Sequence, residues 1–546
     1  MQGYNGPINT IQAVEVMKSK LTLWDASAML LAVPVALPVL AILLSFFGES
    51  GDTFGHLATT VLPDYLLNTV LLMLLVGAIA LMIGVPTAWL TARYRFPGSR
   101  VFPLLLVLPL AAPAYVLGYV YADLLDYTGP VQSSLRALLG LSSLPPIRSL
   151  PGAALVIAFA VYPYIFLLAR VSFSQQAANH ILVAKTLGAD SRRVFWRVVL
   201  PVARPAIVGG LALVLMETVA DYGVVEHYGV QTFTTGIFRT WFAMGSPSGA
   251  LQLAACLFVI AAMLVTLEEM SRKGQLANPV APVPAELEAL SGWRSLLASL
   301  ICLTPVVIGF IVPVTALLVD AVAEGDALDV ARLVSLISNT LLVALIAAGI
   351  CVAAAVWLAY AGRRTEHPFI RSGVRLATLG YAIPGMVLAV GLLQPLATFD
   401  RSLATVILES FETNIGLLMT GSLGGLVLVY VARFLTVAFN NVQSNLIQVN
   451  ARYDEVAATL GASPSRILRR IHLPLLLPGV GTALLVVFVD VIKELPATLV
   501  LRPFNFDTLA TRVFRLASDE RLAEASTAAL LIVLLGLIPT LFLTRR

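Results

Sequence analysis

Long uninterrupted apolar runs are the feature that most constrains this chain. Runs of 18 or more apolar residues recur along its whole length, and each can cross a hydrocarbon core of roughly 30 Å as a helix. The runs are continuous and do not alternate between apolar and polar residues, and open sheet edges cannot face lipid. The sequence therefore predicts an all-α polytopic membrane protein.

Composition agrees with this class. Of the 546 residues, 58% are hydrophobic and 12% are charged, whereas a soluble domain carries about 25% charged residues. The net charge of +4 is too small to indicate a nucleic-acid partner. Cys256, Cys302 and Cys351 all lie inside apolar runs and form no CxxC pair, so we expect no disulfide framework and no redox chemistry.

About twelve transmembrane helices are expected, six on each side of a polar, Pro-rich segment at residues 268–294. Their expected ranges are 26–47, 66–92, 101–122, 150–169, 206–225, 250–267, 296–319, 339–361, 374–398, 414–432, 479–497 and 524–543. The loop 48–65 has no basic residue, whereas the loop 93–100 has three arginines. The positive-inside rule therefore predicts that both termini are cytoplasmic. The polar first 25 residues do not resemble a cleavable signal peptide.

The two halves of the sequence repeat at a constant offset of 273 in the numbering. Residues 183–205 align without a gap with residues 456–478, and 11 of the 23 positions are identical. Parallel repeats of this kind arrange two halves around an axis along the membrane normal. We therefore expect two tandem six-helix repeats, with boundaries at 1–267 for the first repeat, 268–294 for a cytoplasmic linker and 295–546 for the second repeat.

Further pairs support the duplication. Asn68-Thr69 recurs as Asn339-Thr340, and Pro113 recurs as Pro384, at nearly the same offset. Near the end of each half, Thr235 and Arg239 align with Thr508 and Arg512 at the offset of 273. These pairs predict that the halves share their helix order and the positions of their helix breaks.

The best-matched segment of each half is typical of a helix–turn–helix. Gly188 and Gly461 are placed to end a first helix, and Asp190 or Ser463 to cap a second one, with Pro464 at its first position. The second helix is basic and apolar and ends at Leu-Pro in both copies. Taken alone, this pattern also fits an amphipathic helix that lies on anionic lipid.

The spacing within these segments resembles the EAA loop of ABC-importer permeases. In the second copy, near 449–478, Glu455-Val456-Ala457 is followed at fixed distances by Gly461 and Pro474. The first copy, near 176–205, has the same spacing but has Leu182 where the pattern has Glu. The resemblance implies that both loops are coupling helices for a cytoplasmic ATPase, and it assigns that role to Ala184, Gly188, Pro201, Glu455, Ala457, Gly461 and Pro474.

The stretch after the eleventh span narrows the resemblance. Lys493-Glu494-Leu495-Pro496 and residues 501–510 are similar to fused permeases of the ferric iron type, as are residues 229–237 in the first half. The resemblance implies the permease subunit of an ATP-driven ferric iron importer in the bacterial inner membrane. It also implies two copies of an ATPase subunit and a periplasmic or surface binding protein as partners. Permeases for thiamine, phosphonate and polyamine share much of this layout and remain alternatives.

The chain has no phosphate-binding loop of the form GxxxxGK[ST]. We therefore expect no enzyme activity, no catalytic residue and no cofactor on this chain, with ATP and Mg²⁺ bound by the partner ATPase. The five histidines are scattered without metal-ligand spacing, so no metal site is expected.

Four carboxylates inside the expected spans are candidates for the translocation pathway. Glu217 and Asp221 are four residues apart on the fifth span, and Asp490 and Glu494 match them at an offset of 273 on the eleventh. Residues four apart share a helix face, and Glu217 would lie about 16 Å from the start of its span. Ionisable groups at this depth are costly and tend to face a cavity. The alternative is a buried pair bonded to neighbouring helices, with Lys493 as one such partner.

Two other classes of function compete with an ATP-driven importer. The four carboxylates would also suit a secondary transporter driven by an ion gradient, and a scaffold or channel would need no energy at all. Neither alternative explains why a loop expected in the cytoplasm is duplicated with its spacing intact, so the sequence favours the importer.

Overall fold

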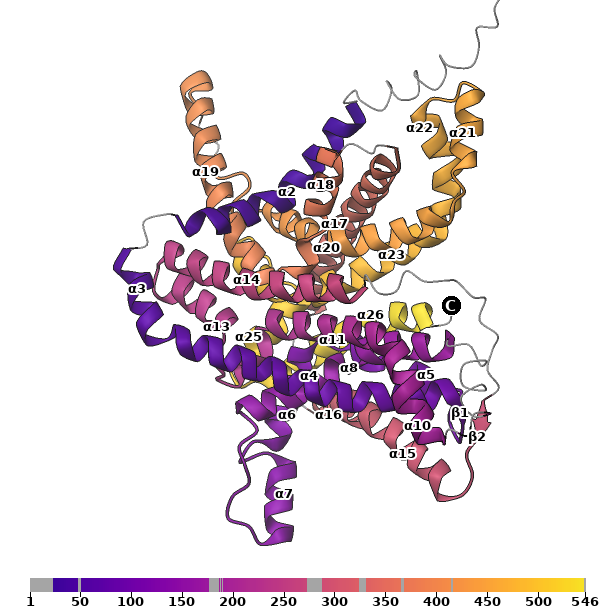
Figure 1. Cartoon of the computed structure of the whole chain (residues 1–546). Coiled ribbons are helices and arrows are strands. Elements are labelled where there is room, and N and C mark those ends of the chain that lie inside the picture. The colour runs from indigo at the N-terminus through magenta and orange to yellow at the C-terminus, as the bar shows by residue number, and fades with distance from the viewer. Residues whose placement is uncertain are drawn as a thin grey trace, which may run out of the picture. The chain divides into compact units, whose positions relative to one another are not determined.

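The computed structural model describes residues 23–47, 51–175, 186, 188, 190–272, 287–323, 330–364, 368–413 and 416–544. Within these ranges the chain is helical apart from turns and two short strands, β1 (Tyr94–Arg95) and β2 (Glu288–Ala289) (Figure 1). The strands pair in parallel, with Tyr94 opposite Glu288. This pairing joins the end of the expected linker 268–294 to the loop that follows the second span. Residues 273–286 of the linker lie outside the described ranges.

Ten described helices are long and apolar enough to span a membrane, and one bent pair, Phe102–Ala111 with Ala114–Leu139, gives an eleventh. The predicted all-α polytopic class is confirmed. The expected ninth span overlaps α19 (Gly385–Phe411), which is not among these helices. Gln394, Asp400 and Arg401 interrupt the apolar residues of this helix.

The chain divides into two compact units. Unit 1 comprises Met1–Leu44, Asn339–Val491 and Val500–Phe506; unit 2 comprises Ser45–Ser338, Ile492–Leu499 and Asp507–Arg546. The first helix of each half of the sequence therefore belongs with helices of the other half. The two compact units therefore do not coincide with the two sequence repeats. The boundaries of the repeats remain a prediction.

Unit 2 is built around α8 (Leu150–Gln175), which packs between α4 (Leu62–Arg93) and α11 (Leu200–Ala220). Glycines make this packing close. A Cβ atom at Gly84 would lie 2.9 Å from the Cβ of Ile165, and one at Gly210 would lie 2.8 Å from the Cα of Ile165. Small residues that let backbones approach are the usual means of packing helices in a membrane.

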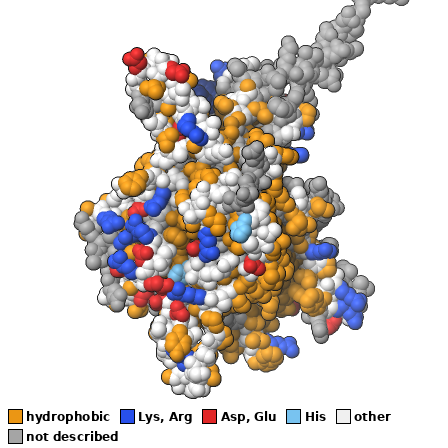
Figure 2. Space-filling view, turned by 90° about the vertical axis from the view of Figure 1, so that its left-hand side faces the viewer, with side chains coloured by type: hydrophobic (Ala, Val, Ile, Leu, Met, Phe, Trp, Pro, Cys, Tyr) orange, Lys and Arg blue, Asp and Glu red, His pale blue; other side chains and the backbone are white. Residues whose placement is uncertain are grey.

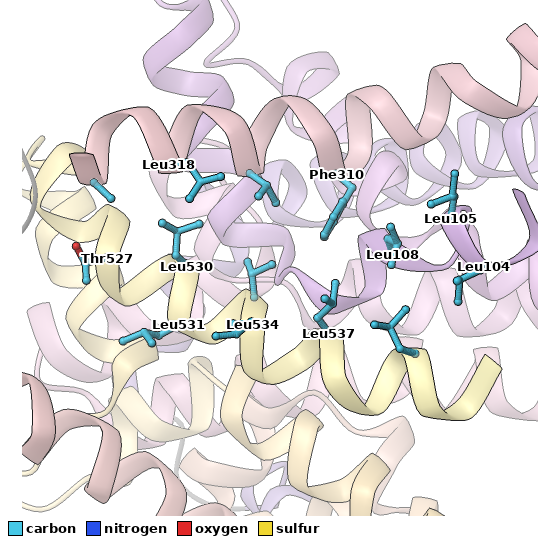
Figure 3. Close-up of a pocket in the computed structure, with 14 residues that line it drawn as sticks. Leu104, Leu105, Leu108, Phe310, Leu318, Thr527, Leu530, Leu531, Leu534 and Leu537 are labelled. Carbon is cyan, nitrogen blue, oxygen red and sulfur yellow. The ribbon is translucent and has the colours of Figure 1, made fainter. Parts of the chain in front are cut away.

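Unit 2 also contains shorter helices and further long apolar helices besides α4, α8 and α11 (Figure 1). They are α3 (Gly51–Thr60), α5 (Phe102–Leu105), η1 (Leu108–Ala111), α6 (Ala114–Leu125), α7 (Pro130–Leu139), α10 (Ser191–Val194), η2 (Phe195–Val199), α12 (Gly223–His227), α13 (Phe233–Phe238), η3 (Arg239–Ala243), α14 (Pro247–Arg272), α15 (Trp293–Val306), η5 (Val307–Ile311), α16 (Val312–Ala323), α25 (Leu509–Ser518) and α26 (Leu522–Thr544). An apolar groove of 640 Å³ runs between α5–η1, η5–α16 and α26, with Phe310 and Leu534 among its lining residues (Figure 3). Hydrophobic side chains are also exposed over a broad surface (Figure 2), as expected where a protein faces lipid.

Unit 1 joins α2 (Leu23–Ser45) to helices of the second half. These are most of α17 (Val330–Arg364), α18 (Pro368–Ala377), η6 (Gly380–Ala382), α19, α20 (Leu423–Gln448), α21 (Arg452–Thr459), α22 (Pro464–Ile467), η7 (Leu468–His472) and α23 (Leu473–Lys493). Trp357 on α17 donates a hydrogen bond to Ser27 Oγ on α2 at 2.9 Å. Gly380 lies so close to the backbone of Ala432 that any side chain there would clash.

The duplication is visible in the backbone. The π-helical turns η2 and η7 are related by the same offset of 273, and so are the helices that follow them, α11 and α23. Pro113 and Pro384 each adopt an extended conformation at the start of a helix, directly after a short 3₁₀ turn. The two halves therefore share local helix breaks as well as sequence.

Candidate functional site

The second matched loop, residues 449–478, has the predicted helix–turn–helix backbone, but Ser463, the predicted cap, lies at the N-cap of α22 without a side-chain hydrogen bond to the backbone of that helix. Helix α21 ends at Thr459, and Gly461 adopts the left-handed backbone conformation with φ of +75°. The N–H groups of Gly461 and Ala462 donate to the carbonyl oxygens of Ala458 and Ala457, each at 3.0 Å. Glycine ends helices in this way because it lacks a Cβ atom. Pro464 then opens α22, so the turn joins two helices as expected.

The first matched loop, residues 176–205, is described only from Thr186 onward and without residues 187 and 189. Ala184 lies outside the described residues. Gly188 again adopts the left-handed conformation, with φ of +81°. Asp190 accepts a hydrogen bond from the N–H of Arg193 at 3.3 Å, so it caps α10 as predicted. Pro201 is exposed in the first turn of α11.

Helix α21 presents apolar side chains to the surface. Tyr453, Val456 and Leu460 are exposed, the last by 81%, and they lie at helical spacing. Glu455 is exposed beside them, whereas Ala457 points inward and is buried. Exposed apolar residues grouped on one helix and rimmed by polar ones mark a surface for another protein.

The carboxylates of the fifth span do not share a continuous helix. Helix α11 ends at Ala220, and Asp221 is extended, with φ of −64° and ψ of +135°. The expectation that Glu217 and Asp221 line one helix face is therefore wrong. Asp221 Oδ1 accepts hydrogen bonds from the N–H groups of Val224 and Val225, at 3.1 and 3.2 Å, and so caps the short helix α12. Glu217 lies half-buried on α11.

The eleventh span breaks at the equivalent position. Helix α23 ends at Lys493, and Glu494 accepts a hydrogen bond from the N–H of Ala497 at 3.1 Å, at the start of α24 (Pro496–Leu501). Pro496 disfavours a helical conformation at the preceding residue, which accounts for the break. Lys493 Nζ donates to the carbonyl oxygen of Leu110 at 2.9 Å. Asp490, the remaining candidate, lies half-buried on α23 and belongs to unit 1.

Interrupted helices with carboxylates at the break are informative in a membrane protein. Backbone that leaves the helical conformation at membrane depth is tolerated where it is buried in protein or lines a cavity. In transporters such discontinuous helices commonly form the substrate site. The structure thus gives a reason to regard the matched pair Asp221 and Glu494 as pathway candidates, namely their position at helix breaks. Helix periodicity alone does not give this reason.

The segment after each break is held by a threonine capping box. Thr232 and Thr235 cap α13, and Thr508 and Thr511 cap α25, so the offset here is 276 and not 273. The predicted pairing of Thr235 with Thr508 is therefore wrong by one helical turn, because the second half has a longer connection after its break. Thr234 Oγ1 also donates to the carbonyl oxygen of Asp221 at 2.8 Å. This last bond joins the connection after the first break to the break itself.

A charged cluster at the α25–α26 turn was not predicted. Arg148, between α7 and α8, donates two hydrogen bonds to the carboxylate of Glu520, at 2.7 and 2.9 Å, and lies 3.1 Å from Asp126. The hydrogen bond from Arg148 lowers the pKa of Glu520, and Glu520 in turn raises that of Arg148. Asp123 and Asp320 line a polar pocket of 420 Å³ beside this turn. Residues so far apart in the chain carry no sequence signal for such a pair.

Metal-ligand clusters of three or more His, Cys, Asp or Glu residues do not occur within the ranges that the structure describes. In the same ranges, the three cysteines are free.

Comparison with known proteins finds the same family in both halves of the chain. The model of the family described as binding-protein-dependent transport system inner membrane component matches residues 84–268 and again residues 352–546. The chain is 28% identical over 524 residues to the Fe(3+)-transport system permease protein FbpB 2 of Haemophilus influenzae, covering 94% of this chain and 96% of the relative.

Shorter relatives match one part of the chain. The molybdenum transport system permease protein ModB of Escherichia coli K12 is 27% identical over 217 residues, covering 38% of this chain and 93% of ModB. The sulfate transport system permease protein CysT of the same strain is 30% identical over 142 residues, covering 26% of this chain and 50% of CysT.

Proposed function

Since the chain belongs to the family of binding-protein-dependent transport system inner membrane components, we propose that it is the permease of an ATP-driven importer of ferric iron. The family makes it a multi-pass transport subunit. The observation that supports iron most strongly is the match to a ferric iron permease along 94% of the chain.

The two matched loops are the proposed sites of energy coupling. Each carries the same glycine turn and ends at Leu-Pro, and the second also exposes an apolar strip beside Glu455. Two loops call for two docking surfaces, so we propose two copies of a separate ATPase subunit on the cytoplasmic side. That subunit binds ATP and Mg²⁺, and both termini of this chain lie on the same side of the membrane.

The charge at the helix breaks supports a cationic substrate. Asp221 and Glu494 lie at equivalent breaks, and a carboxylate attracts a cation strongly where water is scarce. The relatives named for sulfate and molybdenum share a smaller part of the chain. A ferric ion delivered by a periplasmic binding protein therefore fits the proposed pathway better than an oxyanion does.

The geometry suggests how ATP drives transport. Closure of the ATPase subunits would move α21, and η7 connects this loop directly to α23, which ends at the break before Glu494. A movement of α23 would change the surroundings of Glu494 and Lys493, and the same connection runs from η2 through α11 to Asp221. Alternating access would then follow from movements of helices that are interrupted at fixed positions.

The test is uptake into proteoliposomes that contain the permease and its ATPase, with the binding protein added outside. We expect uptake of ferric iron that requires both internal ATP and the binding protein. Uptake of thiamine, phosphonate, polyamine, sulfate or molybdate in place of iron would overturn the substrate. Uptake driven by an ion gradient without ATP would overturn the importer class and favour a secondary transporter.

A further inference from the structure

Arg363, at the end of α17, bonds to three places in the second half of the chain. Its Nε donates to Asp454 Oδ2 on α21 at 2.7 Å. Its two terminal nitrogens donate to the carbonyl oxygens of Leu446 and Val449, at 2.8 and 2.9 Å, at the end of α20. The last carbonyl groups of a helix have no partner within the helix. One guanidinium therefore both completes the end of α20 and holds α21.

Asp454 is bound from a second side as well. Its other oxygen, Oδ1, pairs with Nε2 of His472, the last residue of η7, whose side chain is fully buried. The ring of Tyr360 on α17 lies 5.3 Å from that imidazole, and its hydroxyl donates to the carbonyl oxygen of Pro464 at 2.9 Å. We call Arg363, Asp454, His472 and Tyr360 the polar clamp. It connects α17, α20, α21, α22 and η7.

The chemistry of the polar clamp favours a fixed geometry. A guanidinium is planar and presents its donors in a rigid fork, and charge-assisted hydrogen bonds are shorter and stronger than neutral ones. The side chain of Arg363 is 17% exposed, so water screens its bond to Asp454 only in part. Removing one partner of such a buried arrangement leaves the others uncompensated.

In the sequence of the first half, the positions matched to three members of the polar clamp carry apolar residues. At an offset of 273, Asp454 corresponds to Ile181 and His472 to Val199. At the same offset Arg363 corresponds to Leu90. The nearby Arg93, at the end of α4, bonds to Glu288 of β2 at 3.3 Å.

Aromatic packing holds the corresponding region of the first half. The ring centroid of Trp89 on α4 lies 5.2 Å from that of Phe195 on η2 and 5.4 Å from that of Phe173 on α8. Apolar contacts of this kind are less directional than the hydrogen bonds of a guanidinium group. Among the residues that the structure describes, the polar clamp therefore occurs in the second half.

Building on the proposed function, we propose that Arg363, Asp454 and His472 are positioning residues that fix α21 to the membrane helices of the second half. A movement that the ATPase imposes on α21 is then transmitted to α17, α20 and α23, because the polar clamp prevents α21 from moving independently of these helices. Asp454 acts inside the loop, whereas its neighbour Glu455 is exposed toward the partner. The two adjacent carboxylates thus have different tasks, transmission and docking.

The test measures ATP hydrolysed per ferric ion imported, in proteoliposomes of the complete transporter. Asp454→Asn keeps the size of the side chain but removes its charge, and Arg363→Lys keeps the charge but removes the fork. We expect both variants to retain the ATPase through purification. We expect each to use at least about fivefold more ATP per ion, the range of a coupling free energy between distant sites. The effects of the two changes should be less than additive in the double variant, because both disrupt the same Arg363–Asp454 bond, although each also disturbs another bond of the polar clamp.

Matched controls separate transmission from docking and from folding. Glu455→Gln, one residue away, should weaken ATPase binding, whereas Ser444→Ala, at an exposed position of α20, should leave the ratio of ATP to iron unchanged. His472→Gln keeps a donor for Asp454 and should preserve the ratio, whereas His472→Val should raise it. An unchanged ratio in both Asp454→Asn and Arg363→Lys would overturn the polar clamp. Failure of the unmodified protein to import iron with ATP would instead overturn the proposed function.

Discussion

The two matched loops have the same backbone but different anchors. Both contain a glycine in the left-handed conformation, a short α-helix, a π-helical turn and Leu-Pro, at a constant offset of 273 in the numbering. In the second loop a charged network holds α21 to the membrane helices, whereas in the described part of the first loop an aromatic cluster packs η2 against α4 and α8. Backbone geometry is thus the shared part of the two loops, and side-chain anchoring is the part that differs.

The comparison yields a rule for mutations. Changes to the shared backbone should affect both loops alike, because the same φ angle and the same turn are needed twice. Changes to exposed or anchoring side chains should affect mainly the second loop. The predictions below use this difference, beginning with the largest effect.

Proline at the turn glycines should have the largest effect. Proline cannot adopt the φ of +81° or +75° found at Gly188 and Gly461, and Gly461→Pro also removes an N–H that donates to Ala458. The local cost is about 3 kcal/mol or more. We expect Gly188→Pro and Gly461→Pro each to abolish iron uptake while the protein still inserts and the ATPase still hydrolyses ATP. Asparagine, which tolerates the left-handed conformation, is the control at both positions. Loss of uptake from one loop alone would show that the loops do not share this requirement.

The matched helix breaks give the second prediction. In the double variant Asp221→Asn with Glu494→Gln, the amide oxygens can still accept the backbone N–H bonds that cap α12 and α24, so the breaks should persist. The charge is lost, and we expect ferric iron uptake to fall sharply while ATPase activity remains.

Asp400 offers a matched control for this double variant. Asp400 is also buried and accepts backbone N–H bonds, from Met419 at 2.9 Å and Thr420 at 2.7 Å, but it is not at a matched break. Asp400→Asn should leave uptake unchanged. Full uptake by the double variant would show that Asp221 and Glu494 only cap helices and do not take part in transport.

Much of the architecture follows from the sequence, because lipid exposure leaves a strong local signal. Most of the spans, the duplication and the turn glycines Gly188 and Gly461 were predictable from apolar runs and spacing, whereas the expected ninth span was not found among the membrane-spanning helices. The helix break before Asp221 was not, because no proline marks it and apolar letters continue on both sides. The break at Glu494 is marked in the sequence by a proline, Pro496, two residues later.

Long-range polar contacts also escaped prediction. Arg363 and Asp454 are 91 residues apart, and nothing in the local sequence of either indicates the other. The grouping of α2 with the second half is of the same kind, since an apolar helix can pack on many partners. A useful signal was present at Asp454-Glu455, where two adjacent carboxylates on one helix must point in different directions.

A moderate effect is expected at the residue that distinguishes the loops in sequence. Glu455→Ala should weaken binding of the ATPase subunit by about 0.5–1 kcal/mol, the usual value of an exposed charge contact. Leu182→Ala, at the matched position of the first loop, should weaken it less because leucine offers no carboxylate. Titration of purified ATPase against the permease in nanodiscs measures both. Equal losses at the two positions would remove this asymmetry between the loops.

The smallest effect on transport is expected at the capping boxes, which both halves share and which we expect to contribute to stability. Thr232→Ala and Thr508→Ala should each lower stability by about 1 kcal/mol, since each threonine side chain bonds to the backbone at the start of its helix. Thermal unfolding in detergent should show two similar decreases in Tm, and serine at either position should restore most of the loss. A large decrease at one position only would show that the two caps are not equivalent.

Photo-crosslinking from the second matched loop tests most directly whether a separate ATPase docks there. A photoreactive amino acid at Val456, which is 57% exposed on α21, is compared with one at Val406, which is 58% exposed on α19. In membranes that contain the complete transporter, we predict capture of the ATPase subunit from position 456 and none from position 406. Absence of capture at position 456 from a transporter that imports iron, or equal capture at both positions, would contradict the account.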